Sequence, residues 1–476
     1  MEKDFYITTA IAYVNNRPHI GHAYEFILAD IFARYKRLLG TPVFFNTGVD
    51  EHGQKVWQKA LSEGQDVRKY ADLNTGFFKE LTKELAISYD RFIRTTDKDH
   101  IKTAQWFWQR VKAKGDLYLK DYEGYYCVGC EEFKEEEDLT DGKCPIHNLQ
   151  PEKVAEKNWF FRLSRYKKQL RLLIKENIIE IVPAHRKQEL LNLLEKAQDV
   201  SVSRSKKRVP WGIPVPGDED QVMYVWFDAL LNYLTAARKN PRSLSIKKSD
   251  FERWPADLQI IGKDIFRFHA ILWQAMLLSA GFSPSRKIFV HGFITLRGEK
   301  MSKTLGNVID PFNLIKTRGV TTLRYYFARY IPTTEDGDFL PELFDKAYES
   351  DLANDLGNLL QRFLVLVTKN DVNLSGFIGR EERLPDWYIE KMENFQFAEV
   401  LSEIWKIIGE ANRLFNKERP WEKLKTDPPK ARQTLGIIYR FLLDISFFLS
   451  PFLPSLSQEI DQQLKTFQPK ILFPKT

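Results

Sequence analysis

Cysteine and histidine are scarce in this sequence, with three cysteines and eight histidines in 476 residues. All the cysteines, Cys127, Cys130 and Cys144, lie within one short segment. An odd number of cysteines, gathered in this way, argues against a disulfide framework. The cysteines therefore require another explanation.

The sequence also lacks a long uninterrupted apolar run. The most apolar stretch, "FLLDISFFLSPFLP", contains Asp444 and two prolines, whereas a membrane span needs roughly 20 apolar residues. The first ten residues, "MEKDFYITTA", include acids at once and no apolar segment typical of a secretory signal. We therefore expect a cytoplasmic protein.

Strong charge of one sign is absent as well. The chain has 71 basic and 64 acidic residues, a net charge of +7. This balance gives only weak support to a polyanionic partner, and a uniformly solvated surface explains it equally well. No GxxxxGK[ST] motif is present, which argues against a P-loop enzyme.

The order of the segments indicates several domains. Strand-like and helix-like runs alternate at the start and again after about residue 205, which predicts a parallel, doubly wound (Rossmann-like) α/β sheet. The middle segment reads as an insertion, and the last part is helical, which predicts a bundle. We divide the chain into the first half of this α/β domain (1–115), an insertion with the cysteines (116–205), the second half of the α/β domain (206–290), a loop region (291–340) and an α-helical domain (341–476).

One stripe illustrates the predicted bundle. In "FAEVLSEIWKIIGEANRLF", apolar residues recur at helical spacing. The predicted buried residues are Phe397, Val400, Leu401, Ile404, Ile408, Ala411 and Phe415.

Two histidines stand at the expected start of the first helix. "PHIGH" places His19, Gly21 and His22 directly after the strand-like "FYITTAIAYV". A helix N-terminus favours anions, and imidazoles add N–H donors for phosphate oxygens. Gly21 would let a flat ring lie against the backbone. The alternative is that the histidines are a helix cap or a core contact.

A second motif, "GEKMSKTLGNVIDP", carries Lys300, Ser302 and Lys303 in a loop flanked by glycine. Two lysines beside a hydroxyl group could bind a triphosphate and neutralise the charge that develops during nucleotidyl transfer. Taken alone, a solvated surface loop explains the motif as well.

Together, "HIGH" after the first strand and "KMSKT" after the last strand resemble the signature of the class I aminoacyl-tRNA synthetases. Further segments are similar to the methionyl-tRNA synthetase family, in that family's order: "GVDEHGQKV", "YVWFDALLNYL", "IIGKDIFRFHAILW" and "LRYYFARYIP". The resemblance covers almost the whole chain. It implies ATP-dependent activation of methionine and its transfer to tRNA(Met), with Mg²⁺ accompanying ATP.

The resemblance also implies roles for individual residues. The catalytic residues would be His19, His22, Lys300 and Lys303, and ATP would bind at Gly21, Gly262, Asp264, His291 and Lys303. The methionine pocket would comprise Ala10, Ile11, Tyr13, Asp50, Trp226, Leu230, Tyr233, Ile265, Phe268 and His269. Asp50 would hold the α-ammonium group, because a desolvated cation needs a counter-charge.

The residues by themselves leave two alternatives open here. "GKD" is common turn chemistry, and an aromatic stripe is more often core than pocket. Trp226, Leu230 and Tyr233 fall at i, i+4 and i+7, so we expect them to share one face of one helix. "KMSKT" departs from the family's "KMSKS", and Ala12 and Val49 depart from it near the pocket, which leaves the pocket volume open.

The cysteines then fit a metal site. "CVGC" and "CPIH" offer Cys127, Cys130, Cys144 and His147, three thiolates and an imidazole that would complete a closed tetrahedral structural zinc site. The alternative is a set of unligated thiols.

The helical domain is expected to read the anticodon. Leu352, Leu356, Leu359 and Phe363 would face inward, while Asn358 and Arg362 share a polar side at i, i+4. An amide, a guanidinium group and the Trp421 ring could bind splayed-out bases. The family's "NxxxR" and "PW" elements match these residues, whereas Trp421 could equally be a core or helix-start residue. The chain ends soon after this domain, so we expect a monomer.

Two other interpretations fit parts of the sequence. Class I synthetases for leucine, isoleucine or valine carry an editing domain larger than this insertion, and a cysteine enzyme would need a thiol-selective metal in the active site. The rival from another class is a zinc-knuckle nucleic-acid-binding protein without catalysis.

Overall fold

The computed structural model describes residues 3–127, 132–134, 136–145, 149–241, 243, 245–301, 308–377 and 383–474. The chain forms two compact units. Unit 1 comprises Met1–Pro18, Pro42–Glu80 and Tyr89–His291, and unit 2 comprises His19–Thr41, Leu81–Ser88 and Gly292–Thr476.

The centre of unit 1 is a parallel seven-stranded sheet. Its strands follow the order β2-β3-β1-β13-β14-β8, and β4 also pairs with β3. β1 and β14 are almost wholly buried and β13 wholly so, as expected for a parallel sheet covered on both faces. The strands are β1 (Phe5–Thr9), β2 (Ala12–Tyr13), β3 (Val43–Asp50), β4 (Arg91–Arg94), β8 (Glu180–Val182), β13 (Leu258–Gly262) and β14 (Lys287–His291). The predicted Rossmann-like fold is therefore confirmed.

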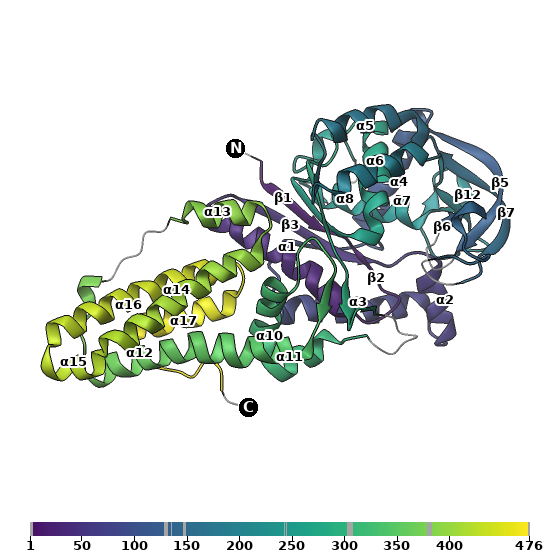
Figure 1. Cartoon of the computed structure of the whole chain (residues 1–476). Helices are drawn as coiled ribbons and strands as arrows, with labels where there is room; N and C mark the ends of the chain where they lie inside the picture. Colours follow the sequence, from purple (N-terminus) through teal and green to yellow (C-terminus); the bar gives the residue numbers. More distant parts are fainter. Residues whose placement is uncertain are drawn as a thin grey trace. The chain divides into compact units, whose positions relative to one another are not determined.

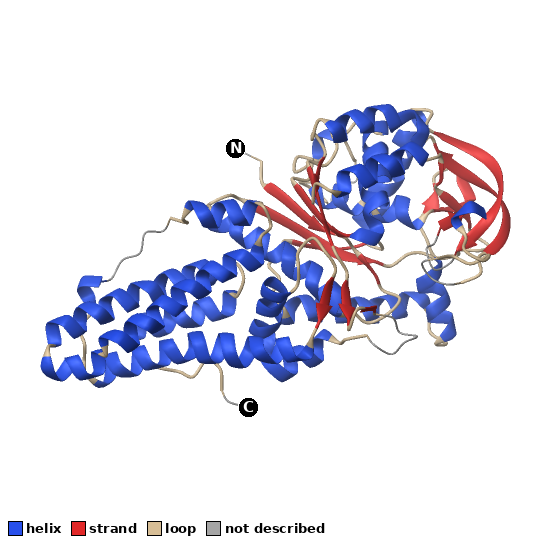
Figure 2. Ribbon diagram, in the orientation of Figure 1, coloured by secondary structure: helices blue, strands red, loops and turns tan. Residues whose placement is uncertain are grey.

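Two antiparallel sheets complete the strands of unit 1 (Figure 2). One contains β5 (Leu117–Cys127), β6 (Glu132–Lys134), β7 (Glu152–Phe161) and β9 (Val200–Ser201), all within the predicted insertion. The other contains β10 (Ser203–Ser205), β11 (Pro214–Val215) and β12 (Asp218–Met223). The range 116–205 also supplies β8, which pairs with β14 at the edge of the main sheet.

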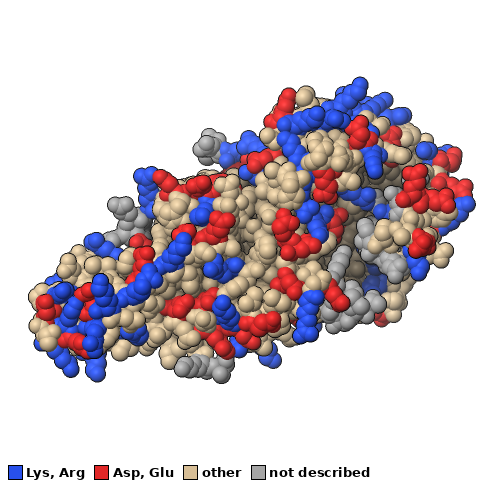
Figure 3. Space-filling model, viewed as in Figure 1, with Lys and Arg blue, Asp and Glu red and all other residues tan. Residues whose placement is uncertain are grey.

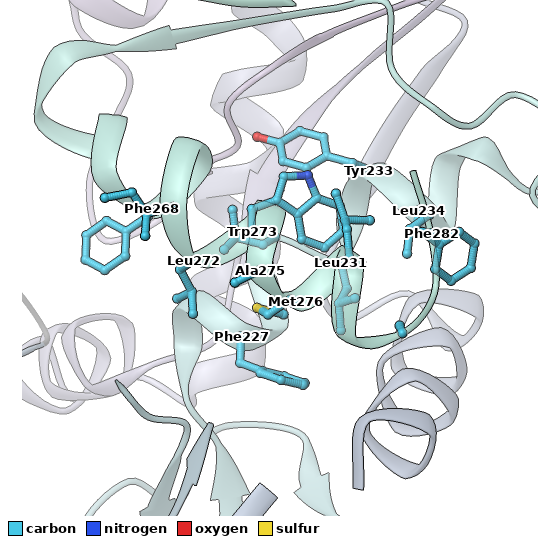
Figure 4. Close-up of a cluster of buried hydrophobic side chains, with 14 of the residues drawn as sticks. Phe227, Leu231, Tyr233, Leu234, Phe268, Leu272, Trp273, Ala275, Met276 and Phe282 are labelled. Atoms are coloured by element: carbon cyan, nitrogen blue, oxygen red, sulfur yellow. The ribbon is translucent and has the colours of Figure 1, made fainter. Parts of the chain in front are cut away.

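The helices of unit 1 pack on a large apolar core, part of which is drawn in Figure 4. The α-helices are α2 (Gln54–Ser62), α4 (Lys98–Ala113), α5 (Lys167–Lys175), α6 (Arg186–Lys196), α7 (Val225–Ala229), α8 (Asn232–Ala237) and α9 (Trp273–Ser279). The shorter elements are the π-helix η5 (Phe268–Leu272) and the 3₁₀ helices η1 (Glu136–Asp138), η2 (Leu163–Tyr166), η3 (Lys248–Asp250) and η4 (Lys263–Ile265). α3 (Val67–Glu84) begins in unit 1 and ends in unit 2.

Unit 2 begins with α1 (Ile20–Leu38) and a small sheet of β15 (Ile294–Leu296), β16 (Glu299–Lys300) and β17 (Gly337–Phe339). Arg297 and Gly298 join β15 to β16 with φ angles of 53° and 78°. Positive φ at both residues of a two-residue loop suits the twist of a hairpin.

The rest of unit 2 is helical. Its helices are α10 (Pro311–Tyr330), α11 (Pro341–Lys346), the π-helix η6 (Ala347–Gly357), α12 (Asn358–Lys369), the 3₁₀ helix η7 (Ser375–Phe377), α13 (Asp386–Glu393), α14 (Phe397–Glu418), α15 (Pro420–Thr426), α16 (Pro428–Leu449) and α17 (Pro454–Thr466). Figure 1 shows α12, α14, α16 and α17 running alongside one another. The buried residues of α14 are the seven of the predicted stripe, and this prediction is confirmed.

Figure 3 shows basic and acidic side chains interspersed over the visible face, in line with the balanced composition. Within the described part of the chain, every helix is too short or too polar to cross a bilayer.

Candidate functional site

The main sheet reverses its strand order between β1 and β13. β1 continues toward β3 on one side, while β13 and β14 continue on the other. In open α/β sheets, ligands bind outside the carboxyl ends of the strands at such a reversal. The Ala10 backbone N–H, directly after β1, donates to the Ile260 carbonyl oxygen on β13 at 3.1 Å. The half-buried Ala10 and Ile11 therefore lie at this position.

Three of the predicted ATP-binding residues lie at the end of β13 and β14. Gly262 pairs with His291 of β14, and the exposed Asp264 lies on η4, directly after β13. A Cβ atom at Gly262 would approach the Asp264 Oδ1 atom to 2.9 Å. Only glycine therefore leaves this carboxylate in place. The turn alternative and the binding interpretation are compatible here, because a turn presents the carboxylate.

Asp50 is the last residue of β3 and is only 2% exposed. It pairs with Tyr13 of β2, and its Oδ1 atom lies 3.3 Å from both the Thr95 hydroxyl group and the His52 backbone N–H. Ala12 and Val49, the two departures from the family pattern, pair with each other in the same ladder.

Aromatic rings gather next to these strand ends. The Trp226 and Phe268 rings are stacked, with centroids 4.0 Å apart and planes 5° apart. Tyr13 meets the Trp226 ring edge-on at 6.4 Å. Trp226, Tyr13 and Ile265 are only partly buried and pack against the core, whereas Leu230 and Tyr233 belong to the core itself. These aromatic and apolar residues thus form one cluster at the boundary of the core.

One prediction about this cluster was wrong. Trp226, Leu230 and Tyr233 do not share one helix, because α7 ends at Ala229 and α8 begins at Asn232. The Asn232 side chain accepts from Asn46 of β3 at 3.0 Å and donates to the Ala229 carbonyl oxygen at 2.8 Å. These buried tertiary hydrogen bonds accompany the break, which helical periodicity alone does not reveal.

His269 is a buried neutral imidazole. Burial lowers its pKa to about 4. Its Nδ1 atom lies 3.0 Å from the Ile265 carbonyl oxygen, which can only accept, so Nδ1 carries the proton. Nε2 then accepts from the Tyr233 hydroxyl group at 2.7 Å. Figure 4 shows Tyr233 and Phe268 within the surrounding buried cluster. The hydrogen bonds therefore fix the orientation of the Tyr233 hydroxyl group.

His19 and His22 lie in unit 2, at the start of α1. His19 is the N-cap, and its Nδ1 atom accepts from the Gly21 backbone N–H at 3.1 Å. The His22 Nδ1 atom accepts from the His19 backbone N–H at 3.1 Å. The cap alternative is thus observed. Because each Nδ1 accepts, each neutral ring carries its proton on Nε2.

The structure explains why position 21 is glycine, which the sequence did not reveal. A Cβ atom there would lie 2.9 Å from the His19 ring and displace it.

Further along unit 2, Lys300 ends β16, and the predicted catalytic Lys303 lies outside the described residues.

The predicted metal ligands are only partly described. Cys127 ends β5, and both Cys127 and Cys144 are buried. Cys130 and His147 lie outside the described residues. The described residues contain no group of three potential metal ligands, and this finding does not test a site with two ligands outside them.

A cavity of about 290 Å³ lies on the helical bundle, lined by Arg362, Val365, Leu366, Lys369, Phe415 and Trp421. The Arg362 guanidinium group lies 4.5 Å from the centre of the Phe415 ring and donates to the Asn416 side chain at 2.8 Å. Arg362 and Trp421 both line this cavity, whereas the exposed Asn358 does not. Sequence reasoning missed Phe415 here because its stripe marked it as core.

The sequence profile of the family described as tRNA synthetases class I (M) matches residues 5–148 and 134–364. The chain is 40% identical to the methionine–tRNA ligase of Caldanaerobacter subterraneus subsp. tengcongensis, over 98% of this chain and 74% of that protein. It is also 40% identical to the corresponding protein of Synechocystis sp., over 97% and 89%.

A solved structure agrees with these relatives. The Mycobacterium tuberculosis methionyl-tRNA synthetase in complex with methionyl-adenylate superposes with a TM-score of 0.89 and 37% identity, covering 100% of this chain and 99% of the other. The resemblance inferred from "PHIGH" and "KMSKT" is confirmed. The chain belongs to the class I tRNA synthetases and, among them, to the methionine–tRNA ligase family.

Proposed function

We propose that this chain activates methionine with ATP and transfers the methionyl group to the 3′ end of tRNA(Met). The observation that carries the proposal is the likeness, along the whole chain, to a synthetase whose structure contains methionyl-adenylate. The cluster of Tyr13, Trp226 and Phe268 beside the ends of parallel strands supports it, because an unbranched thioether needs an apolar, aromatic pocket.

In the first half-reaction, a methionine carboxylate oxygen attacks the α-phosphorus of ATP. The bond from that phosphorus to the bridging oxygen breaks, and pyrophosphate leaves. In the second, a terminal ribose hydroxyl of tRNA attacks the carbonyl carbon of the adenylate, and AMP leaves. Positioning and charge stabilisation suffice, without a covalent enzyme intermediate. Mg²⁺ bound with ATP would supply further neutralisation of the phosphates.

The side chains that would bind the ATP phosphates carry N–H donors or positive charge. The Nε2–H groups of His19 and His22 would donate to phosphate oxygens, since their Nδ1 atoms are used in capping. Lys303, assisted by Lys300, would neutralise the leaving pyrophosphate. Gly262, Asp264 and His291 would bind the adenosine, with the exposed Asp264 carboxylate accepting from ribose hydroxyls.

Residues at or beside the ends of the parallel strands of unit 1 would bind methionine. Asp50 would pair with the α-ammonium group, and Ala10, Ile11, Tyr13, Trp226, Leu230, Ile265 and Phe268 would surround the side chain. The Tyr233 hydroxyl, held by the neutral His269, would face the thioether.

In tRNA recognition, the cavity around Arg362 and Trp421 would hold an anticodon base. Its apolar lining and its guanidinium group suit stacking and hydrogen bonding to an unpaired base. Asn358, one turn before Arg362, would contribute from outside the cavity.

A structural zinc ion would be held by Cys127, Cys130, Cys144 and His147 and would stabilise the fold of the segment between β5 and β7. The burial of both described thiols suits ligands rather than reactive surface cysteines. The five domain ranges, a cytoplasmic location and a monomeric state stay predictions.

The zinc proposal predicts one zinc ion per purified chain and loss of that ion in Cys144→Ser, together with a lower thermal midpoint. Metal analysis and thermal unfolding measure both without reference to activity. A wild-type chain purified without chelator that carries no zinc and unfolds at the same temperature as Cys144→Ser would contradict the proposal.

Amino-acid-dependent ATP–pyrophosphate exchange with each of the twenty amino acids tests the function. We expect exchange with methionine alone. Exchange with another amino acid would keep the reaction and overturn the pocket, and no exchange with any amino acid would overturn the proposed activity.

A further inference from the structure

Asp228 is a buried carboxylate of unit 1 to which the proposed chemistry gives no role. It lies on α7, two residues after Trp226, and is inaccessible to solvent. Each of its oxygen atoms faces a histidine. Oδ2 lies 2.7 Å from His52 Nδ1, and Oδ1 lies 2.6 Å from His100 Nε2.

The charge of Asp228 depends on these histidines. Burial by itself would raise its pKa, but His52 and His100 outweigh burial and hold the pKa below its usual range. Asp228 is therefore an ionised acceptor for two ring N–H groups. On the far side of His100, Nδ1 lies 3.2 Å from the Thr235 hydroxyl group of α8, so this half of the cluster anchors Asp228 to α4 and α8.

The other half of the cluster leads to the end of β3. His52 is two residues from Asp50, and its backbone N–H lies 3.3 Å from the Asp50 Oδ1 atom. The His52 ring meets the Trp211 ring edge-on at 5.5 Å, and the Gly53 backbone N–H donates to the Trp211 carbonyl oxygen at 3.1 Å. Contacts with Trp211 and Asp228 thus hold the segment that follows Asp50 in place.

Glu51, between Asp50 and His52, is anchored to different elements. Its Oε1 atom accepts from Arg94 Nε at 2.8 Å and from the Thr75 hydroxyl group at 2.5 Å. Glu51 thus binds residues of β4 and α3, whereas His52 binds a residue of α7. Both residues that follow Asp50 are fixed by buried charged contacts.

We propose that Asp228 is a positioning residue for the amino-acid substrate. Through His52 it holds the Asp50 carboxylate in a fixed place relative to Trp226, because α7 carries both Asp228 and Trp226. The α-ammonium group and the side chain of the substrate are then recognised by parts of one rigid assembly. This inference rests on the proposed function.

The first test is Asp228→Asn, which preserves shape but cannot accept from both histidines. In ATP–pyrophosphate exchange we expect the KM for methionine to rise about tenfold or more, with the KM for ATP and kcat within about twofold of wild type, since only one substrate loses its positioned contact. An unchanged KM for methionine, or equal increases for both substrates, would overturn the inference.

A pair of His52 variants keeps the test decisive if Asp228→Asn folds poorly. His52→Ala removes the donor to Asp228, whereas His52→Asn places an amide N–H where Nδ1 stood. We expect His52→Ala to raise the KM for methionine and His52→Asn to restore most of the loss. Equal effects of the two substitutions would contradict a role through this hydrogen bond.

A double-variant cycle separates positioning from general damage. Once Asp50 is replaced by asparagine, the place of its carboxylate no longer matters, so adding Asp228→Asn should raise the KM for methionine by less than about twofold further. Full multiplication of the two effects would overturn the inference.

Ser446→Ala is the matched control. Ser446 is a fully buried polar residue of α16 in unit 2, and its hydroxyl donates to the Ser457 carbonyl oxygen at 2.9 Å. It should lower the thermal midpoint without changing the KM for methionine. If wild type itself showed no exchange with methionine, the proposed function would fail. If wild type exchanged normally and the variants kept its KM, only the positioning role would fail.

Discussion

The two nitrogens of His19 have different partners, and this division separates folding from chemistry. Nδ1 caps α1, whereas Nε2 carries the donor proposed for ATP. His19→Asn retains an acceptor near the Nδ1 position and lacks the distal donor. We expect it to fold with nearly wild-type stability and to lower kcat for pyrophosphate exchange about 10²–10³-fold, the usual cost of one lost donor to a developing charge.

His19→Gln provides the converse variant, because its amide N–H reaches the Nε2 position. It should recover part of the activity and lose the cap, which costs about 1 kcal/mol of unfolding free energy. Urea unfolding and exchange kinetics on both variants measure the two effects. If both variants were equally active and equally stable, the two nitrogens would not divide these roles.

His269 predicts a dependence of stability on pH. Burial lowers its pKa from 6.5 to about 4. Between these values the unfolded chain binds a proton that the folded chain does not, so stability falls as the pH falls through this window. Full titration would cost about 3 kcal/mol, at 1.36 kcal/mol per pKa unit. Denaturant unfolding of wild type and His269→Gln at pH 7 and pH 5 measures this contribution.

The expected outcome is a smaller loss of stability on acidification in His269→Gln than in wild type, because glutamine has no proton to gain. The variant should be less stable at pH 7, since Nδ1 donates to Ile265 and glutamine does not reproduce that geometry. An identical pH response in the two proteins would show that His269 is not buried in its neutral form.

At the scale of elements, a buried ion pair joins α1 to α10. Asp30 of α1 and Arg324 of α10 are both fully buried and lie 2.7 Å apart. Arg324 also donates to the carbonyl oxygens of Leu85 and Phe452, at 3.0 and 2.7 Å. The helix that begins with His19 and His22 is thereby fixed within its unit.

We expect Asp30→Asn to lower the unfolding free energy by about 3–5 kcal/mol, because it leaves the Arg324 charge buried without its counter-charge. Arg34→Gln is the matched control. Arg34 also binds Asp30, at 2.7 Å, but it is 25% exposed, so its loss should cost much less. Urea unfolding compares the two variants, and equal costs would contradict the assignment of burial as the cause.

Sequence patterns did not predict where helices break or change their hydrogen-bonding type. The expected helix from Trp226 to Tyr233 is two helices, and a π-helix, η6, precedes Asn358. Apolar periodicity indicates which residues are buried, and Leu352, Leu356, Leu359 and Phe363 are indeed buried. It does not detect a change in backbone hydrogen bonding, because the buried face continues across it.

At the scale of the whole molecule, activation and tRNA recognition should be separable. Arg362 lines the cavity of the bundle, whereas the predicted methionine residues belong to unit 1. Arg362→Gln should lower kcat/KM for aminoacylation of tRNA(Met) about 10–100-fold, through the loss of contacts to one base. ATP–pyrophosphate exchange without tRNA should stay unchanged.

Val365→Ser is a suitable companion variant, because Val365 lines the same cavity, is 41% exposed and has no charge to contribute. It should reduce charging less than Arg362→Gln. An equal fall in exchange and in charging for Arg362→Gln would mean that the substitution damages the fold rather than tRNA binding.

The sequence by itself determined the family and the fold class, because motifs and strand-helix alternation are local patterns. "PHIGH", "KMSKT" and the α14 stripe are read along the chain, and the same is true of Cys127 and Cys144 near one another in sequence. Only the tertiary structure decided that His52 and His100 meet on Asp228, that β8 joins the main sheet, and that Phe415 lines a cavity. The physical reason is that buried charges and pocket walls depend on partners distant in sequence, which chain folding alone brings within hydrogen-bonding distance.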